Sequence, residues 1–106
     1  YTTEDEIMDL GLTFRGAEDH FDFELLQNEP NPFTDATQIG YILPQNGEVT
    51  LTLFDLTGKQ LISQTLTGVK GLNKVELTKD QIGAQGMIYY QVQFQGYTAT
   101  KKMLIL

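Results

Sequence analysis

Alternation of apolar and polar residues is the feature that most constrains this chain. Ile88, Tyr90, Val92 and Phe94 alternate with Tyr89 and three glutamines. Successive side chains of a β-strand point to opposite faces, so a period of two predicts a strand with one buried and one hydrated face. The pattern recurs at 49–53 and 74–78, and no run of a dozen residues carries an apolar stripe at helical spacing. These strands favour an antiparallel fold over a parallel sheet, which would need helical crossovers.

Turn residues separate the strands at short intervals. Asn46-Gly47 follows the run that ends at Leu43, and this dipeptide is expected to supply the positive φ of a tight hairpin. Further turns are expected at 57–58, 68–71 and 95–96, and one helical turn at 78–82 with Thr78 as its cap. The pattern predicts a meander of six or seven short strands, folded into an immunoglobulin-like antiparallel β-sandwich of about seven strands.

The first part of the chain has a different composition. Eight of the fourteen acidic residues lie within the first 27 positions, at Glu4, Asp5, Glu6, Asp9, Glu18, Asp19, Asp22 and Glu24. The chain starts at Tyr1 and not at methionine, so it is expected to be part of a longer protein. We interpret residues 1–22 as the tail of an upstream domain plus an acidic linker, with an alternating strand at Met8 to Phe14. Residues 23–106 are expected to form one domain, a size that builds a core without metals or disulfides.

Charge and residue types exclude several function classes. Fourteen acidic and seven basic side chains give a net charge of −7, which opposes contact with nucleic acids and anionic membranes, and no apolar run is long enough to insert into a membrane. The chain has no cysteine and therefore no disulfide, thiolate metal site or thiol nucleophile.

Catalytic and metal-binding arrangements are not expected. The single histidine, His20, lies beside Glu18, Asp19 and Asp22, but the spacing matches no zinc or calcium motif. The single serine, Ser63, lies inside a strand without the glycine elbow that exposes a nucleophile. Asp35, Asp55 and Asp80 fall at turns, where aspartate usually accepts hydrogen bonds from its own backbone. The sequence predicts a protein that is not an enzyme and has no metal or cofactor.

Non-catalytic motifs follow one another in a characteristic order. They are Leu26-Gln27-Asn28-Glu29-Pro30-Asn31-Pro32-Phe33, the turn at 44–47, Leu53-Phe54-Asp55-Leu56-Thr57-Gly58-Lys59, Gly86-Met87-Ile88-Tyr89-Tyr90 and the final segment Thr98 to Leu106. From Phe23 to Leu106 this order resembles the type A C-terminal sorting domain of the type IX (Por) secretion system of gram-negative bacteria. Leu53-Phe54 replaces the usual valine-tyrosine, and one extra residue separates Gly86 from Tyr89.

The resemblance implies that the domain is an address for export. Its partners would be the type IX translocon, which recognises it at the periplasmic side of the outer membrane, and a sortase-like cysteine protease that cuts it from an upstream cargo domain in the same chain. The cargo would then be joined to lipopolysaccharide at the cell surface or released. An exposed segment from Arg15 to Glu24 is the expected cleavage region.

Recognition residues are expected within the motifs. They are Pro30, Asn31, Pro32, Phe33, Gly58, Gly86, Tyr89, Lys101, Lys102, Met103, Leu104, Ile105 and Leu106, with exposed sheet edges and the terminal strand contacted by main-chain pairing.

Each motif also has a structural interpretation. Pro30 and Pro32 would form a stiff ramp that presents Phe33 to the first sheet, and Gly58 and Gly86 would supply unusual φ angles. Lys101 and Lys102 are adjacent, so they must face opposite sides of a strand, as a receptor handle or as solubilising edge lysines.

Two questions remain open from sequence alone, an alternative function and the oligomeric state. One is a fibronectin-like or carbohydrate-binding accessory module, in which Tyr41, Tyr89, Tyr90 and Tyr97 would line a sugar platform, although Tyr41 and Tyr90 lie at core-facing positions. The other concerns assembly, because an exposed terminal strand could pair with a copy of itself in a homodimer.

Overall fold

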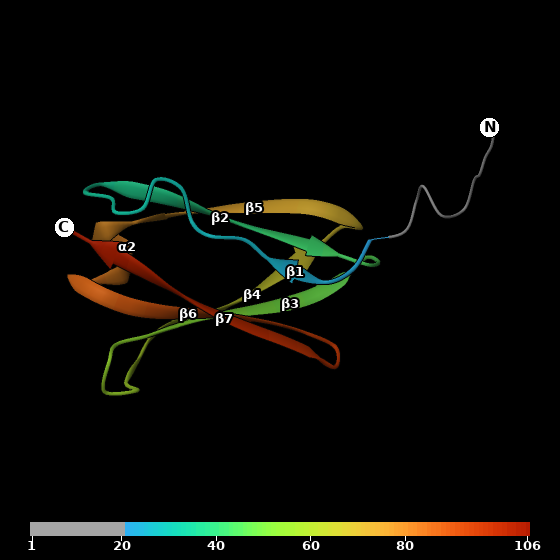
Figure 1. Cartoon of the computed structure of the whole chain (residues 1–106). Helices are drawn as coiled ribbons and strands as arrows, with labels where there is room; N and C mark the ends of the chain where they lie inside the picture. Colours follow the sequence, from blue (N-terminus) through green and yellow to red (C-terminus); the bar gives the residue numbers. More distant parts are fainter. Residues whose placement is uncertain (1–20) are drawn as a thin grey trace, which may run out of the picture.

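Residues 21–106 of the computed structural model form an antiparallel β-sandwich, which confirms the predicted fold class (Figure 1). The strands are β1 (Glu24–Leu25), β2 (Ala36–Leu43), β3 (Gly47–Phe54), β4 (Gln60–Gly68), β5 (Gly71–Thr78), β6 (Gly86–Phe94) and β7 (Tyr97–Ile105), with a short helix α2 (Lys79–Ile82) between β5 and β6. One sheet has the order β1-β2-β5 and the other the order β4-β3-β6-β7. The expected strand at Met8 to Phe14 lies outside these residues, and so do His20, Glu18 and Asp19 of the acidic cluster.

The core lies between the sheets and is built by the predicted alternation. Ile88, Tyr90, Val92 and Phe94 are all buried from β6, and so are Val49, Leu51 and Leu53 from β3. The last strand adds Met103 and Ile105, both essentially without solvent exposure. Deleting the end of β7 would therefore remove core side chains as well as any recognition surface.

The predicted meander is only partly correct. β3 and β4 form one hairpin and β6 and β7 another, but β2 pairs with β5 and not with β3. The turn at Asn46-Gly47 therefore carries the chain from one sheet to the other, and the expected hairpin with positive φ is wrong. A glycine is needed there for a different reason, because a Cβ on Gly47 would lie 2.8 Å from Cε1 of Phe94.

The helical turn follows its sequence signals. Thr78 Oγ1 accepts a hydrogen bond from Gln81 N at 3.1 Å, and the Gln81 side chain accepts one from Thr78 N, which makes a capping box. Gly83 ends the helix with a φ of 70°. No helix among residues 21–106 is long and apolar enough to cross a membrane.

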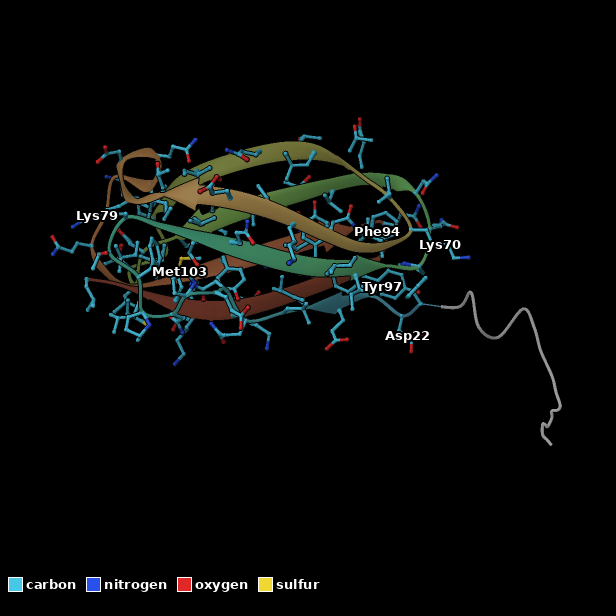
Figure 2. All side chains as sticks on the ribbon, turned by 90° about the horizontal axis from the view of Figure 1, so that it is seen from above. Asp22, Lys70, Lys79, Phe94, Tyr97 and Met103 are labelled. Carbon is cyan, nitrogen blue, oxygen red and sulfur yellow. The ribbon has the colours of Figure 1, made fainter. Side chains whose placement is uncertain are left out.

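The two ends of the sandwich carry different segments. Lys79 and Met103 lie at one end, and Lys70, Phe94 and Tyr97 lie at the other (Figure 2). The β3–β4 hairpin, α2 and the end of β7 all lie at the first of these ends in Figure 1. We call it the motif end, because it gathers motifs that are far apart in the sequence.

Candidate recognition site

The segment that contains the proline motif closes one side of the sandwich, and we call residues 26–33 the strap. Its first part follows β2, where Leu26 N donates to Gly40 O and Glu29 and Gln38 exchange two backbone hydrogen bonds. Its last part follows β7 of the other sheet. The strap therefore joins the two sheets along the edges of β2 and β7.

Hydrogen bonds from the strap cover the outer edge of β7. Phe33 N donates to Leu104 O at 3.1 Å, and Leu106 N donates to Phe33 O at 2.9 Å. Asn31 Oδ1 accepts from Leu104 N, and Gln27 Nε2 donates to Lys102 O. The structure thus brings the predicted residues of the proline motif and of the terminal strand together. These edge groups of Lys102, Leu104 and Leu106 are already paired, so main-chain recognition of them would require the strap to leave.

The two prolines of the strap lead the chain to Phe33. The Glu29-Pro30 and Asn31-Pro32 peptide bonds are both cis. Phe33 is buried, and its backbone pairs with β7 of the four-stranded sheet. The prolines still position Phe33, but against the last strand of the described fold.

A buried polar network anchors the strap from below. The Tyr90 hydroxyl donates to Leu26 O at 2.7 Å and accepts from Asn28 N at 2.9 Å. The Asn28 side chain, almost completely buried, donates to Pro30 O and to Thr37 Oγ1. Burial raises the pKa of Tyr90 to about 12, and the hydrogen bond from Asn28 N acts in the opposite direction. Sequence reasoning placed Tyr90 in the core but missed the role of its hydroxyl.

The hairpin between β3 and β4 is held by Asp55, as expected for an aspartate at a turn. Asp55 Oδ1 accepts from Thr57 N, Thr57 Oγ1 and Lys59 N. The Thr57 hydroxyl, followed by Lys59 N, lowers the pKa of this carboxyl group. Gly58 has a φ of 91° and Gly86 one of 92°, which confirms that both positions use a conformation that favours glycine.

The motifs also share one face of the four-stranded sheet. Core residues of β3 and β6 point inward, so Phe54, Tyr89 and Met87 point outward. Phe54 is paired with Tyr89, Tyr89 with Lys102, and Met87 with Leu104. We call Phe54, Met87, Tyr89, Lys102 and Leu104 the motif patch.

The motif patch is apolar where the rest of the face is polar. Toward the other end, the outward residues are Gln91, Gln93, Thr98 and Thr100. Met87 is 39% exposed, and Leu56 in the adjoining hairpin is 61% exposed. Sequence reasoning missed Phe54 and Met87, although the change from glutamine to tyrosine and methionine on the outward side of β6 was a readable signal.

The two terminal lysines face opposite sides, as predicted. Lys101 is paired with the core residue Tyr90 and lies on the inner side at the sheet edge, where it is partly buried. Lys102 is exposed on the outer side beside Tyr89. Lys102 brings a positive charge into the motif patch on a chain whose total charge is −7, and the adjoining hairpin carries one charge of each sign, Asp55 and Lys59.

The tyrosines do not form a sugar platform. Tyr41 and Tyr90 are buried, and burial also raises the pKa of Tyr41. Tyr89 lies in the motif patch, whereas Tyr97 lies near the opposite end and stacks on Phe23 at 5.4 Å between ring centroids. Of the tyrosines in residues 21–106, the two that reach the surface are therefore too far apart along β6 and β7 to contact one sugar ring together.

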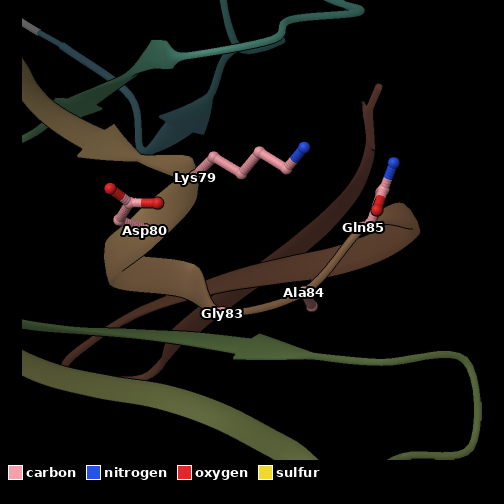
Figure 3. A pocket seen from close by; sticks show the side chains of 5 residues that line it. All are labelled: Lys79, Asp80, Gly83, Ala84 and Gln85. Atoms are coloured by element: carbon pink, nitrogen blue, oxygen red, sulfur yellow. The ribbon is translucent and has the colours of Figure 1, made fainter.

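A shallow pocket lies between α2 and the start of β6 (Figure 3). It is lined by Lys79, Asp80, Gly83, Ala84 and Gln85. Asp80 points away from Gln85, and Lys79 Nζ donates to Leu106 O at 2.9 Å. Ser63 lies on the outer face of β4 beside Thr52. Among residues 21–106, no three histidine or acidic side chains cluster as metal ligands would.

Comparison with known families decides what these motifs belong to. The sequence model described as the secretion system C-terminal sorting domain matches residues 30–106, which is most of the chain. The chain belongs to the type IX secretion C-terminal sorting domain family. The sorting domain is thus a signal for export to the cell surface or the extracellular space, and its family is not catalytic. No curated protein and no solved structure was found to match the chain.

Proposed function

We propose that this sorting domain is read by the type IX translocon through its motif end. The observation that carries the proposal is the motif patch, in which residues from three separate motifs meet on one outward face. The side chains of the motif patch do not belong to the buried core. The core is instead built by the residues that alternate with them, which are Leu53, Ile88, Tyr90, Met103 and Ile105. A largely apolar patch that includes one lysine, on an acidic domain, has the composition of a protein-binding surface.

Eleven of the thirteen expected recognition residues then divide between two roles, direct contact and support of the fold. Tyr89, Lys102 and Leu104 would contact the machinery directly. Phe33, Met103 and Ile105 would act by holding the fold, since they are buried. Pro30, Asn31 and Pro32 would act by keeping the strap on β7, while Gly58 and Gly86 fix the hairpin and the start of β6.

The proposal includes the cargo and its release. Residues 1–22 would be the tail of the cargo plus a linker, and residues 23–106 the sorting domain that passes through the periplasm. A sortase-like cysteine protease would cut between them, after which the cargo is attached to lipopolysaccharide or released. Phe23 stacks on Phe94 and Tyr97, and Glu24 pairs with Ile42 in β1. We therefore propose that the cut lies before Phe23. The expected cleavage region, which extended from Arg15 to Glu24, then ends at residue 22.

A reporter assay tests the recognition surface. The complete chain is fused behind a periplasmic reporter in a strain with the type IX system, and the double variant Met87→Gln with Leu104→Gln is compared with the unchanged fusion. We expect the reporter to accumulate in the periplasm and its surface or extracellular fraction to fall at least about tenfold, the effect of losing about 1.4 kcal/mol of binding.

A matched control separates recognition from folding. Gln93→Ala with Thr98→Ala changes another cross-strand pair on the same face, away from the motif patch. Export of this control should remain normal, and circular dichroism should show that both purified double variants are folded. Normal export of the folded Met87/Leu104 variant would contradict the proposal. A deletion of Lys101 to Leu106 is less informative, because it also removes Met103 and Ile105 from the core.

A further inference from the structure

The long edges of the sandwich are protected to different degrees. The outer edge of β7 is hydrogen-bonded to the strap from Lys102 onward. The outer edge of the other sheet, β5, carries the charged residues Lys74 and Glu76. Within the described part of the chain, the backbone of β4 has hydrogen bonds to β3 and to no other element. β4 is thus a nine-residue edge strand that nothing in residues 21–106 covers.

The sequence of β4 also lacks the usual protection of such an edge. Natural edge strands discourage pairing with charged residues, proline or strong bulges. β4 reads Gln-Leu-Ile-Ser-Gln-Thr-Leu-Thr-Gly and contains no charge and no proline. Its register shift against β3 lies at Leu53/Phe54, close to one end, so residues 62–67 form a regular ladder. The net charge of −7 is therefore carried outside this edge, and β4 itself offers no charge repulsion to a second copy.

The residues of β4 are complementary to a reversed copy of themselves. Pairing with Val49, Leu51 and Leu53 places Leu66, Gln64 and Ile62 toward the core side. In an antiparallel pair centred on Gln64, Ile62 of one copy would face Leu66 of the second copy. Ser63 would face Thr65 of the second copy on the outer side, and the two Gln64 amides would face each other. Apolar pairs and hydroxyl pairs are favourable cross-strand partners.

We propose that two copies of this chain pair through β4, antiparallel and about a two-fold axis at Gln64. The two four-stranded sheets then become one continuous sheet of eight strands. The motif-patch residues of β6 and β7 lie away from the axis, whereas Phe54 lies on β3 next to the pairing strand. A symmetric contact of this kind closes on itself and does not extend into a fibre. Because the contact is a single strand pair, the dimer is weak and forms at high local concentration.

Sedimentation equilibrium of the complete chain tests the proposal. Over protein concentrations from about 10 µM to about 1 mM, we expect the mean mass to rise toward that of a dimer. The double variant Ser63→Lys with Thr65→Lys places lysines opposite one another across the axis, and it should remain monomeric over the same range.

The control has the same chemistry at the other edge. Thr98→Lys with Thr100→Lys also puts two lysines on exposed outward positions of an edge strand, and it reduces the net charge by the same amount. This variant should dimerise at least as well as the unchanged chain, because two added lysines make the net charge of each copy less negative and weaken the repulsion between copies. A chain that is monomeric throughout the range, or a control that loses the dimer equally, would overturn the proposal.

A thiol at the axis tests the register. Because the chain has no cysteine, Gln64→Cys introduces a single thiol that faces its own copy in the dimer. Oxidation with oxygen and copper phenanthroline should give a disulfide-linked dimer much faster than it does for Thr100→Cys on the opposite edge. Equal rates for the two variants would show that copies do not meet at β4.

Discussion

Tyr90 shows how one side chain can serve the core and the surface segment above it. Its ring is fully buried within β6, and its hydroxyl bridges Leu26 O and Asn28 N of the strap. A phenylalanine would fill the same space but would leave these two backbone groups without their partner. The hydroxyl thus links the most buried part of the sheet to the segment that covers β7.

Tyr90→Phe should therefore destabilise the domain more than its small change in volume suggests. Loss of a buried partner costs about 1–3 kcal/mol in the free energy of unfolding. The matched variant Tyr89→Phe changes the neighbouring, outward tyrosine and should alter stability by less than about 0.5 kcal/mol. Urea denaturation of both variants checks the prediction, and equal stabilities would contradict it.

For single residues, the sequence predicted which side chains face the core better than it predicted which groups those side chains contact. Alternation placed Tyr41 and Tyr90 in the core correctly, because the period of a strand is a local property. The partners of the Tyr90 hydroxyl lie more than 60 positions away, so no local pattern could reveal them. Gly47 is a second case in which a distant contact was missed. The sequence explained this glycine by a turn, whereas the structure requires it because Phe94 packs closely against its backbone.

At the scale of elements, the strap is the feature that strand patterns did not predict. It has little regular structure of its own, yet it contributes backbone and side-chain hydrogen bonds to both sheets. Hairpins β3–β4 and β6–β7 were predictable from turn residues between alternating runs. The pairing of β2 with β5 and the crossings between sheets were not, because they depend on contacts between distant segments.

Asn31→Ala should loosen the edge of β7 without unfolding the domain. The Leu104 amide loses its acceptor, which corresponds to about 0.5–1.5 kcal/mol. Its hydrogen exchange, measured by nuclear magnetic resonance, should accelerate about 2- to 10-fold, while the Leu106 amide keeps its bond to Phe33 O. Glu29→Ala, in the same strap, is the control and should leave the Leu104 amide unchanged. Unchanged exchange in the Asn31 variant would show that this bond does not protect the edge.

At the scale of the whole molecule, four of the five motifs meet at one end although the sequence spreads them over about 80 residues, while the turn at 44–47 lies at the other end beside Lys70 and Gln95. The proline motif, the β3–β4 hairpin, the start of β6 and the end of β7 all contribute. The order of the motifs was enough to indicate the family and the sandwich. Their common location was not visible before the register of the strands was known.

Stability of the whole fold should fall in strongly alkaline solution. The pKa of Tyr90 is near 10 when unfolded and about 12 when folded, so the neutral hydroxyl is favoured by folding. This contribution is complete below pH 10 and is lost as the pH rises toward 12, by about 2–3 kcal/mol. Tyr41 acts in the same direction. Urea denaturation over this pH range checks the loss, which should be smaller in Tyr90→Phe.

The position of the strap has a consequence for synthesis. Its binding site is the strand around Leu104, which leaves the ribosome more than 70 residues after Asn31. A polypeptide that stops before Met103 lacks two core side chains and has nothing for Phe33 to pair with. Only a chain translated through β7 can assemble the motif end, so under the proposed function prematurely terminated products would not be exported.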